Sequence, residues 1–435
     1  MEKLLKFISE NSDKDVARLI LDRKKHPEID MDLAINCIES RRKLKGKVQE
    51  WYDNPELIFP LKLSAEQCSS SATGTYKADM AAKIAMGSFD FAQDDIKMAQ
   101  DDIKMAQDDK GWRIADLTGG LGVDSWFFSQ KAEKVLYNDM QAALYDAAGH
   151  NFKALGRENI ERSCLLISSD TISDALKGFN PDIVYMDPAR RGEGGKKVFL
   201  IEDCTPDVLT IKDEIFKYTR HILLKLSPMA DITMACSRLG KTCREVHVVA
   251  TGGECKELLI WMDKEWNSEY SITAVELHPN ADTATFTYIP SEESNATSEI
   301  WRPKTCNIND SSLFLFEPGK ALMKAGAYNL IGSTFKVEKL GKSTHYYITE
   351  SIQTAEKLKT FGKVYCIMDY HPLDKRTIKE IGKKYPKSEV TARNIPMDTD
   401  ALRQKLGVTS GDDAHIFGLK SDLEGNILMA GRRLF

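Results

Sequence analysis

Short apolar runs alternate with amphipathic stretches through the middle of the chain. The runs that predict buried strands are residues 113–117, 135–137, 164–168, 181–186, 221–226, 245–250 and 258–262. Between them, apolar residues recur every three or four positions, as in helices, over residues 124–131, 142–155, 207–218 and 231–239. Strands that alternate with helices predict an α/β fold, with a mostly parallel, doubly wound sheet and right-handed crossovers.

The pattern changes on both sides of this region. Apolar positions recur at helical spacing from residue 1 to about residue 49, which predicts a helical N-terminal region. Beyond about residue 280 the pattern indicates a strand, a polar linker at 291–297 and then shorter mixed elements, including a helix at 321–330. We expect a helical domain over residues 1–60, an α/β domain over 61–290 and two small α+β modules over 300–355 and 360–435.

A repeated segment interrupts the α/β domain before its first strand. Residues 89–109 consist of three units, F-D-F-A-Q-D-D, I-K-M-A-Q-D-D and I-K-M-A-Q-D-D. Their apolar seam is thin, and so few units are short for a coiled coil. Residues 89–110 hold 3 Lys against 7 Asp. We predict an acidic heptad-repeat insert on the surface, either helical or disordered.

A glycine turn follows the first predicted strand, in the sequence W-R-I-A-D-L-T-G-G-L-G-V-D at residues 112–124. Glycines at a strand-to-helix turn let the backbone approach a ligand closely. Their spacing is not the G-x-G-x-x-G of dinucleotide-binding proteins, and Asp116 before the turn would repel a pyrophosphate. A carboxylate there suits the sulfonium and amino group of S-adenosylmethionine. The pattern favours an adenosyl pocket, with close strand–helix packing as the other explanation of the glycines.

Four acidic residues stand at the ends of successive predicted strands: Asp116, Asp139, Asp170 and Asp187. Ligands of parallel sheets bind beyond the carboxyl ends of the strands, so these side chains are expected to face one site. Asp139, about twenty residues beyond the glycine turn, is placed to accept hydrogen bonds from ribose hydroxyls.

Composition narrows the class of protein. A net charge of −5 and 42% hydrophobic residues describe an ordinary soluble protein and argue against a strongly basic nucleic-acid protein. No apolar run approaches the roughly 20 residues of a membrane helix. The nine cysteines include no C-x-x-C pair, and the eight histidines show no metal-ligand spacing. We expect reduced thiols, a cytoplasmic location, no membrane contact and no metal.

Several motifs together resemble a known family. The segments D-L-T-G-G-L-G-V-D, N-D, S-D and D-P-A-R-R resemble those of class I S-adenosylmethionine-dependent methyltransferases. More narrowly, the chain resembles a bacterial group in which a Rossmann-like methyltransferase core precedes a ferredoxin-like module and a THUMP-like C-terminal domain. The further motifs of this resemblance are E-Q-C-S-S at 66–70, K-L-S-P-M at 225–229, E-C-K-E at 254–257, F-E-P-G-K-A-L-M-K-A-G-A at 316–327 and A-R-N at 392–394. The resemblance covers nearly the whole chain except the repeats. It implies that residues 300–355 form the ferredoxin-like module and residues 360–435 the THUMP-like domain.

The resemblance implies a cofactor, S-adenosyl-L-methionine, and the residues around it. Asp139 would bind the ribose hydroxyls and Asp170 the adenine amino group, with a helix N-cap as the alternative role of Asp170. The full set of expected cofactor-binding residues is Asp116, Thr118, Gly119, Gly120, Gly122, Asp139, Asp170 and Asp187. Ionised aspartates only accept hydrogen bonds, which matches ammonium, hydroxyl and amine donors.

The segment D-P-A-R-R at 187–191 is the candidate for the transfer site. Asp187 is the candidate base, and Lys225 is expected either to orient the substrate or to form a structural ion pair with Asp187. Related enzymes that methylate amines carry an aromatic residue where this chain has Arg190, so an amine target is not indicated. The expected catalytic residues are Asp187, Pro188, Arg190 and Lys225. The expected substrate-binding residues, unless they form only a flexible charged loop, are Arg190, Arg191, Lys196 and Lys197.

These observations lead to methylation of structured RNA, such as tRNA or rRNA, as the expected function. RNA as the partner rests on the THUMP-like resemblance, on the Arg/Lys loop and on a mildly basic tail, with 13 Lys or Arg against 10 Asp or Glu over 361–435. One alternative is an RNA-binding protein whose core binds the cofactor weakly or not at all. Another is methylation of a protein or a small molecule.

Overall fold

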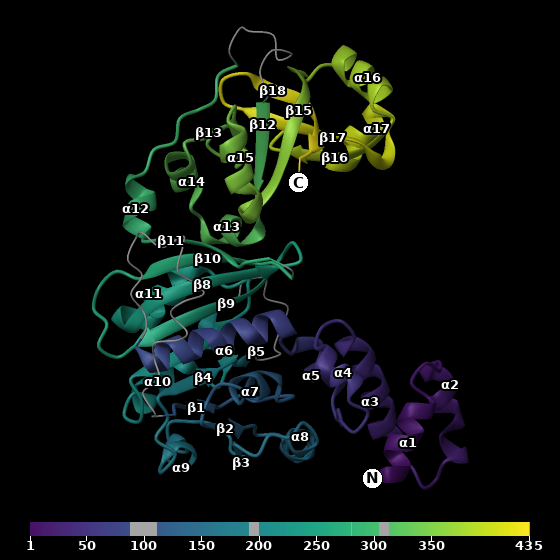
Figure 1. The fold of residues 1–435 in the computed structure, drawn as a ribbon, viewed down its shortest axis with the longest axis vertical. Helices are drawn as coiled ribbons and strands as arrows, with labels where there is room; N and C mark the ends of the chain where they lie inside the picture. Colours follow the sequence, from purple (N-terminus) through teal and green to yellow (C-terminus); the bar gives the residue numbers. More distant parts are fainter. Residues whose placement is uncertain (88–110, 191–199, 280, 304–312, 435) are drawn as a thin grey trace. The chain divides into compact units, whose positions relative to one another are not determined.

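The computed structural model describes residues 1–87, 111–190, 200–279, 281–303 and 313–434. The predicted heptad-repeat insert, together with Arg191, Lys196 and Lys197, lies outside the described residues. The chain divides into two compact units (Figure 1). The first consists of Met1–Val246 with Glu257–Ser268, and the second of His247–Lys256 with Glu269–Phe435.

The first unit begins with helices, as the apolar spacing predicts. They are α1 Glu2–Glu10, α2 Val16–Leu21, α3 Met31–Leu44, α4 Gln49–Asp53, α5 Lys62–Gln67 and α6 Ser71–Met86. Short polar side chains start several of them: Asp15, Asp30 and Ser70 each accept a hydrogen bond from a backbone N–H of the first turn. Arg41 of α3 donates to three backbone carbonyls in residues 52–57, which fixes the connector that follows α4.

A nine-stranded sheet forms the core of the α/β region, with the order β11-β10-β8-β9-β7-β4-β1-β2-β3. Its strands are β1 Arg113–Asp116, β2 Lys134–Asn138, β3 Ile160–Ser163, β4 Ile183–Met186, β7 His221–Leu226, β8 Cys243–Thr251, β9 Glu254–Asp263, β10 Ser271–Leu277 and β11 Ala284–Tyr288. Strands β3, β2, β1, β4 and β7 are parallel, and β9 runs antiparallel to β7. The predicted Rossmann-like fold is confirmed, but the sheet is mixed, because β7 pairs with β9 and β10 pairs with β11 in antiparallel fashion.

Five helices connect these strands: α7 Val123–Phe128, α8 Ala142–Ala154, α9 Ile172–Leu176, α10 Val208–Ile215 and α11 Ile232–Leu239. The apolar runs of the central strands are fully buried, for example Ile183 and Val184 in β4. The strand order reverses between β1 and β4, because β2 lies on one side of β1 and β4 on the other. Such a reversal is where open α/β sheets bind ligands, at the carboxyl ends of the strands.

Three predicted elements are wrong in detail. The third parallel strand is Ile160–Ser163, and the apolar run at 164–168 follows it outside the sheet. The expected polar linker at 291–297 contains helix α12, Pro290–Asn295, because Pro at its first position and Glu292 at the third favour a helix start. The single helix expected at 321–330 is two helices, α13 Lys320–Ala325 and α14 Tyr328–Phe335, because Gly326 takes a left-handed conformation with φ of 91°.

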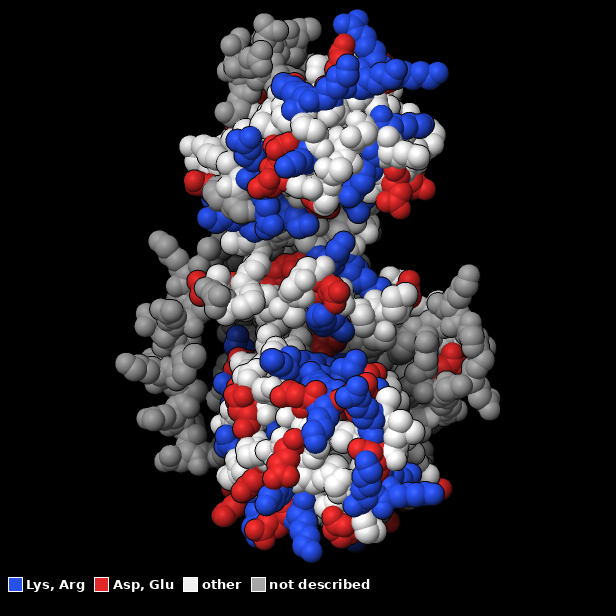
Figure 2. All heavy atoms as spheres, turned by 90° about the vertical axis from the view of Figure 1, so that its right-hand side faces the viewer, with Lys and Arg blue, Asp and Glu red and all other residues white. Residues whose placement is uncertain are grey.

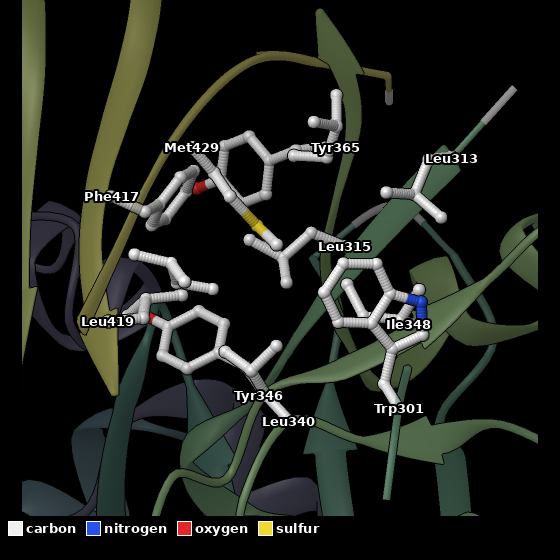
Figure 3. Close-up of a cluster of buried hydrophobic side chains, with 12 residues drawn as sticks. Trp301, Leu313, Leu315, Leu340, Tyr346, Ile348, Tyr365, Phe417, Leu419 and Met429 are labelled. Atoms are coloured by element: carbon white, nitrogen blue, oxygen red, sulfur yellow. The ribbon is translucent and has the colours of Figure 1, made fainter. Parts of the chain in front are cut away.

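The second unit is built on a seven-stranded sheet with the order β13-β14-β12-β15-β18-β17-β16. Its strands are β12 Leu313–Pro318, β13 Glu338–Lys339, β14 Tyr347–Thr349, β15 Gly362–Pro372, β16 Lys387–Arg393, β17 Thr409–Ser421 and β18 Gly425–Arg433. Its further helices are α15 Ile352–Leu358, α16 Lys375–Lys384 and α17 Thr399–Leu406. One buried cluster joins Leu315, Tyr346, Tyr365, Phe417 and Met429 from five segments of the chain (Figure 3).

Helix α6 lies close to α7 at a glycine. A Cβ atom added to Gly74 would lie 2.2 Å from a ring carbon of Phe127, which is buried. Gly149 in α8 offers a contrast, because the three atoms nearest to an added Cβ all belong to the exposed guanidinium of Arg162, the nearest at 2.1 Å. The contact at Gly74 therefore sets the approach of α6 to the strand-end region that α7 borders.

We predict that Gly74→Ala destabilises the first unit, although alanine favours a helix. Displacing the Phe127 ring should cost about 1–3 kcal/mol, which exceeds the gain of about 1 kcal/mol in helix propensity. Gly149→Ala should leave the free energy of unfolding unchanged or raise it, since a surface guanidinium can move aside. Urea denaturation of both variants measures the difference. A Gly74→Ala protein at least as stable as Gly149→Ala would contradict the close contact.

Candidate functional site

The glycine turn after β1 is fastened to the end of β2. The Gly119 N–H donates to the Asn138 carbonyl at 2.7 Å, and the Tyr137 hydroxyl donates to the Gly120 carbonyl at 2.7 Å. Gly120 and Gly122 have φ angles of 54° and 92°, which favour glycine. A Cβ atom on Gly119 would overlap the Tyr137 ring at 2.2 Å. A Cβ on Gly120 would meet nothing nearer than 3.9 Å, so the turn leaves space there.

Asp139 directly follows β2, as predicted for a ribose-binding carboxylate. One of its oxygens accepts from the Gly120 N–H at 2.9 Å and the other from the Gln141 N–H at 2.8 Å. Burial raises the pKa of Asp139, and these two N–H groups oppose that rise. Each carboxylate oxygen can accept a second hydrogen bond, so the group is oriented by the turn and still able to bind a donor.

Asp116, the last residue of β1, is buried beneath the turn. It accepts from the Thr118 N–H at 3.1 Å and from the Ser125 hydroxyl at 2.6 Å. Burial raises the pKa of Asp116 to about 8, and the nearby Asp124 adds to the rise, while the two hydrogen bonds oppose it. The Asp116 carboxyl thus holds Thr118 of the turn and Ser125 of α7 in place through hydrogen bonds. A role toward the ammonium group of a cofactor stays a prediction.

Asp187 directly follows β4 and meets residues of two neighbouring strand ends. Its N–H donates to the Thr118 hydroxyl at 2.6 Å, and its carboxylate accepts from the Lys225 ammonium of β7 at 2.5 Å. The Asp187 side chain is 37% exposed, whereas that of Lys225 is 12% exposed. Burial lowers the pKa of Lys225, but the attraction of Asp187, Glu257 and Asp124 outweighs it and holds that pKa above the ordinary value. The predicted ion pair exists, and its carboxylate is the accessible partner.

Behind this pair lies a set of buried polar groups that the sequence analysis did not include. Lys77 of α6 is fully buried and donates to both oxygens of Glu257 in β9, at 2.8 and 3.0 Å. It also lies 3.3 Å from Asp124 of α7 and donates to the Ser69 hydroxyl at 2.8 Å. The Tyr185 hydroxyl of β4 donates to Asp124 at 2.8 Å.

Local signals for some of these residues exist in the sequence. Ser69 and Glu257 lie in two motifs, at 66–70 and 254–257, that carried the family resemblance without an assigned role. Lys77 stands among small and apolar residues of its helix, where a lysine is rarely fully buried unless it is paired. The partner of Lys77 is 180 positions away, so that no spacing rule identifies it.

Three other predicted site residues, Asp170, Pro188 and Arg190, make none of the side-chain contacts described above. Asp170 is exposed and lies seven residues beyond the end of β3, so it does not directly follow a strand as expected. Its alternative role as a helix cap is also wrong, because the residue before α9 is Thr171 and makes no side-chain cap. Pro188 is buried beside Asp187, and Arg190 ends the two-residue strand β5, Ala189–Arg190, which pairs with β6, Cys204–Thr205.

Large apolar side chains are exposed beyond the same strand ends. Met140 follows Asp139, Leu166 follows β3, and Met229 follows β7; all three are more than half exposed. Apolar groups left in solvent next to oriented polar groups suit a ligand with a flat, partly apolar surface. Among the described residues, no cluster of three or more His, Cys, Asp and Glu side chains has the arrangement of a metal site. Within the same part of the chain, no helix is both long and apolar enough to cross a membrane.

Comparisons with known proteins agree with this architecture. Residues 314–355 match a family model described as a ferredoxin-like domain, and residues 362–433 match one described as THUMP domain-like. No curated protein matches the chain significantly. The crystal structure of a presumed methyltransferase from Porphyromonas gingivalis W83 superposes with a TM-score of 0.81 at 25% identity, covering 100% of this chain and 98% of that one. The core has a Rossmann-like methyltransferase fold. A ferredoxin-like and a THUMP-like domain follow it.

Two further solved structures match only part of this methyltransferase-fold chain. An rRNA methylase from Streptococcus thermophilus is 13% identical, with a TM-score of 0.30, and the match covers 43% of this chain and 94% of that one. The M. capricolum protein TrmK, solved with S-adenosyl-homocysteine, is 14% identical with a TM-score of 0.28, over 36% of this chain and 64% of that one. Scores this low support no inference about the present chain.

The buried Asp116 of the methyltransferase-fold core predicts a pH dependence of stability. The folded protein retains a proton on this carboxyl up to about pH 8, whereas the unfolded chain releases it near pH 3.8. Stabilisation by the protonated form is therefore complete below the unfolded pKa and is lost as pH rises through the folded pKa. The slope approaches about 1.4 kcal/mol per pH unit between these values.

We predict that Asp116→Asn removes this dependence, because the amide keeps the shape of the neutral acid and does not titrate. The free energy of unfolding of the wild type, minus that of the variant, should fall steadily from pH 5 to pH 8. Urea denaturation at four pH values measures it, and the subtraction cancels the other titrating groups. Two curves that stay parallel over this range would contradict a protonated Asp116.

Proposed function

We propose that the protein is an S-adenosylmethionine-dependent methyltransferase that acts on structured RNA. The observation that carries the proposal is the juxtaposition, at the ends of β1, β2, β4 and β7, of the glycine turn, Asp139 and the Asp187–Lys225 pair. Its similarity over the full length to a presumed methyltransferase supports the same reaction class.

The chemistry of the strand-end residues fits the cofactor. Asp139 is an oriented acceptor for the two hydroxyls of a ribose, and Gly120 leaves its side open for close approach. Met140 and Leu166 are exposed on the residues that follow β2 and β3, and they would offer apolar contact to an adenine ring. We propose that Thr118, Gly119 and Gly122 maintain the turn around the amino-acid part.

The transfer itself needs positioning more than acid–base chemistry. When bound, S-adenosylmethionine would supply a methyl group on a positively charged sulfur, which is already activated for displacement. Asp187 would accept a hydrogen bond, or a proton, from the nucleophile, because its carboxylate is the accessible member of its ion pair. Lys225 would hold that carboxylate in place through the 2.5 Å contact, and buried Pro188 would fix the backbone beside it.

We predict that the wild type binds S-adenosylmethionine in calorimetry and that Asp139→Ala weakens the binding at least tenfold. The loss follows because two charge-assisted hydrogen bonds to hydroxyls disappear. Asp146→Ala is the matched control, since Asp146 is an exposed carboxylate on the neighbouring helix α8. Asp170→Ala, measured alongside, tests the expected adenine contact. A folded wild type without measurable binding would refute the enzyme and favour the RNA-binding alternative.

RNA as the substrate is supported by the THUMP-like domain and by one surface of it. Helix α16 buries Ile378 and Ile381 in an apolar cluster that includes Leu402 and Leu406 of α17. The helix, Lys375–Lys384, holds five Lys or Arg and one Glu. In Figure 2 blue side chains gather at the upper end of the molecule, where α16 lies. Exposed cations on one helix face suit the phosphates of a nucleic acid.

We predict that the triple variant Lys375→Ala, Lys379→Ala, Lys383→Ala binds total tRNA more weakly and with a smaller salt dependence. Each lysine that neutralises a phosphate should contribute about 1 to the slope of log K against log salt. The matched control removes three exposed lysines of the first unit: Lys3, Lys6 and Lys24. Fluorescence anisotropy over a salt series measures both slopes. Equal slopes for the two triple variants would remove α16 as the RNA surface.

A further inference from the structure

A chain of buried charges runs behind the strand-end site and ends at its open side. Lys77 contacts Glu257 at 2.8 Å and Asp124 at 3.3 Å. Lys225 lies 4.0 Å from the other oxygen of Glu257 and 2.5 Å from Asp187. We call these five residues the charge chain. Of its members, Lys77 and Glu257 have side chains 0% and 3% exposed, whereas Asp187 is 37% exposed.

Within the part of the chain that the structure describes, the charge chain is not balanced. Two ammonium groups face three carboxylates, so that in their ionised forms the five residues carry a net charge of −1. Burial raises the pKa of Asp116, which lies close to Asp124 and Asp187, so this carboxyl adds less than a full negative charge near neutral pH. The pKa of the Tyr185 phenol is raised by burial and by the same carboxylates, so this group stays neutral as well.

An unbalanced charge in a buried network is costly unless something compensates it. The two ends of the charge chain differ in this respect. Around Lys77 the charges are enclosed: this one ammonium faces both Glu257 and Asp124 and also donates to the Ser69 hydroxyl. At Asp187 the chain opens toward the strand ends, beside the glycine turn to which the Thr118 hydroxyl connects it. The strand-end site therefore lies at the exposed end of a network whose net charge is negative.

We propose that the charge chain makes this site select a cationic ligand, the sulfonium of the methyl donor, over the neutral thioether product. The inference rests on the proposed function and adds to it a reason for product release. Lys77 and Glu257 are not expected to touch the ligand. They act through Asp124, Lys225 and Asp187, and are positioning residues that set the charge of the site.

The experiment compares two probes that differ by one methyl group and one charge, S-adenosylmethionine and S-adenosylhomocysteine. Calorimetry at pH 7.5 gives the ratio of their affinities for each variant. Glu257→Gln brings the charge chain to zero and should lower the preference for S-adenosylmethionine about tenfold. Lys77→Met takes it to −2 and should raise that preference by a similar factor. The double variant restores −1 and should restore the wild-type ratio.

The design separates charge from damage to the fold. Each single variant leaves a buried charge short of a partner and is expected to lower the Tm on the order of 10 °C, whereas the double variant removes both charges. If one single variant does not fold, the other still tests the inference. Glu257→Gln should lower the preference for S-adenosylmethionine and Lys77→Met should raise it, whereas general damage to the site would not give opposite changes. The control is Glu161→Gln, which breaks the exposed pair of Lys134 and Glu161, 2.9 Å apart at the start of β2, and should leave the ratio unchanged.

The outcomes are distinct. The inference is supported if the preference for S-adenosylmethionine over S-adenosylhomocysteine is highest in Lys77→Met, intermediate and equal in the wild type and the double variant, and lowest in Glu257→Gln. Equal ratios in proteins that bind both probes overturn it and leave the proposed function intact. A folded wild type that binds neither probe overturns both.

Discussion

Three hydrogen bonds fasten the glycine turn after β1 to the end of β2, and the geometry of the site depends on them. Two join the turn to the strand, from the Gly119 N–H to Asn138 and from Tyr137 to the Gly120 carbonyl; the third joins Gly120 to Asp139. A side chain on Gly119 would collide with Tyr137, so the strand and the turn cannot approach this closely with any other residue. The same contact that closes the turn also orients the Asp139 carboxylate.

The sequence was sufficient for the parallel part of the sheet and for most of its strand-end acids, but it did not predict β10 or the antiparallel pairing of β9. Parallel strands carry continuous apolar runs, and the residues that follow them are fixed by where those runs stop. Asp116, Asp139 and Asp187 were therefore placed correctly at the ends of β1, β2 and β4. Asp170 was misplaced because the apolar run 164–168 has the composition of a strand, although the sheet uses the less apolar residues Ile160–Ser163 before it. Tertiary pairing decided between two adjacent candidates there, as it often does for short strands.

What the sequence could not supply was the identity of the groups behind the site. A pair of Lys225 with Asp187 was one of the two roles that the sequence left open for this lysine, because the two residues stand at the ends of neighbouring strands that the parallel register brings together. Lys77 and Glu257 come from a helix and from an antiparallel strand, and their approach depends on how α6 packs against α7. No periodicity encodes such a contact. Apolar flanks around a single lysine indicate burial, but they do not name the partner.

The physical cost of this network bears on its purpose. Buried ion pairs are weak contributors to stability, since apolar residues of the same volume often serve as well or better. The first unit already buries a continuous apolar sheet, so that it has no evident need of Lys77 and Glu257 for its core. Burying the charge chain costs free energy, and the chain ends at the accessible carboxylate of Asp187. Its effect on a ligand at that carboxylate explains it better than a contribution to stability does. It fixes an electrostatic potential at the strand ends before any ligand arrives. Preorganised charge of this kind requires no rearrangement at the moment of reaction, which is how electrostatics contribute most to catalysis.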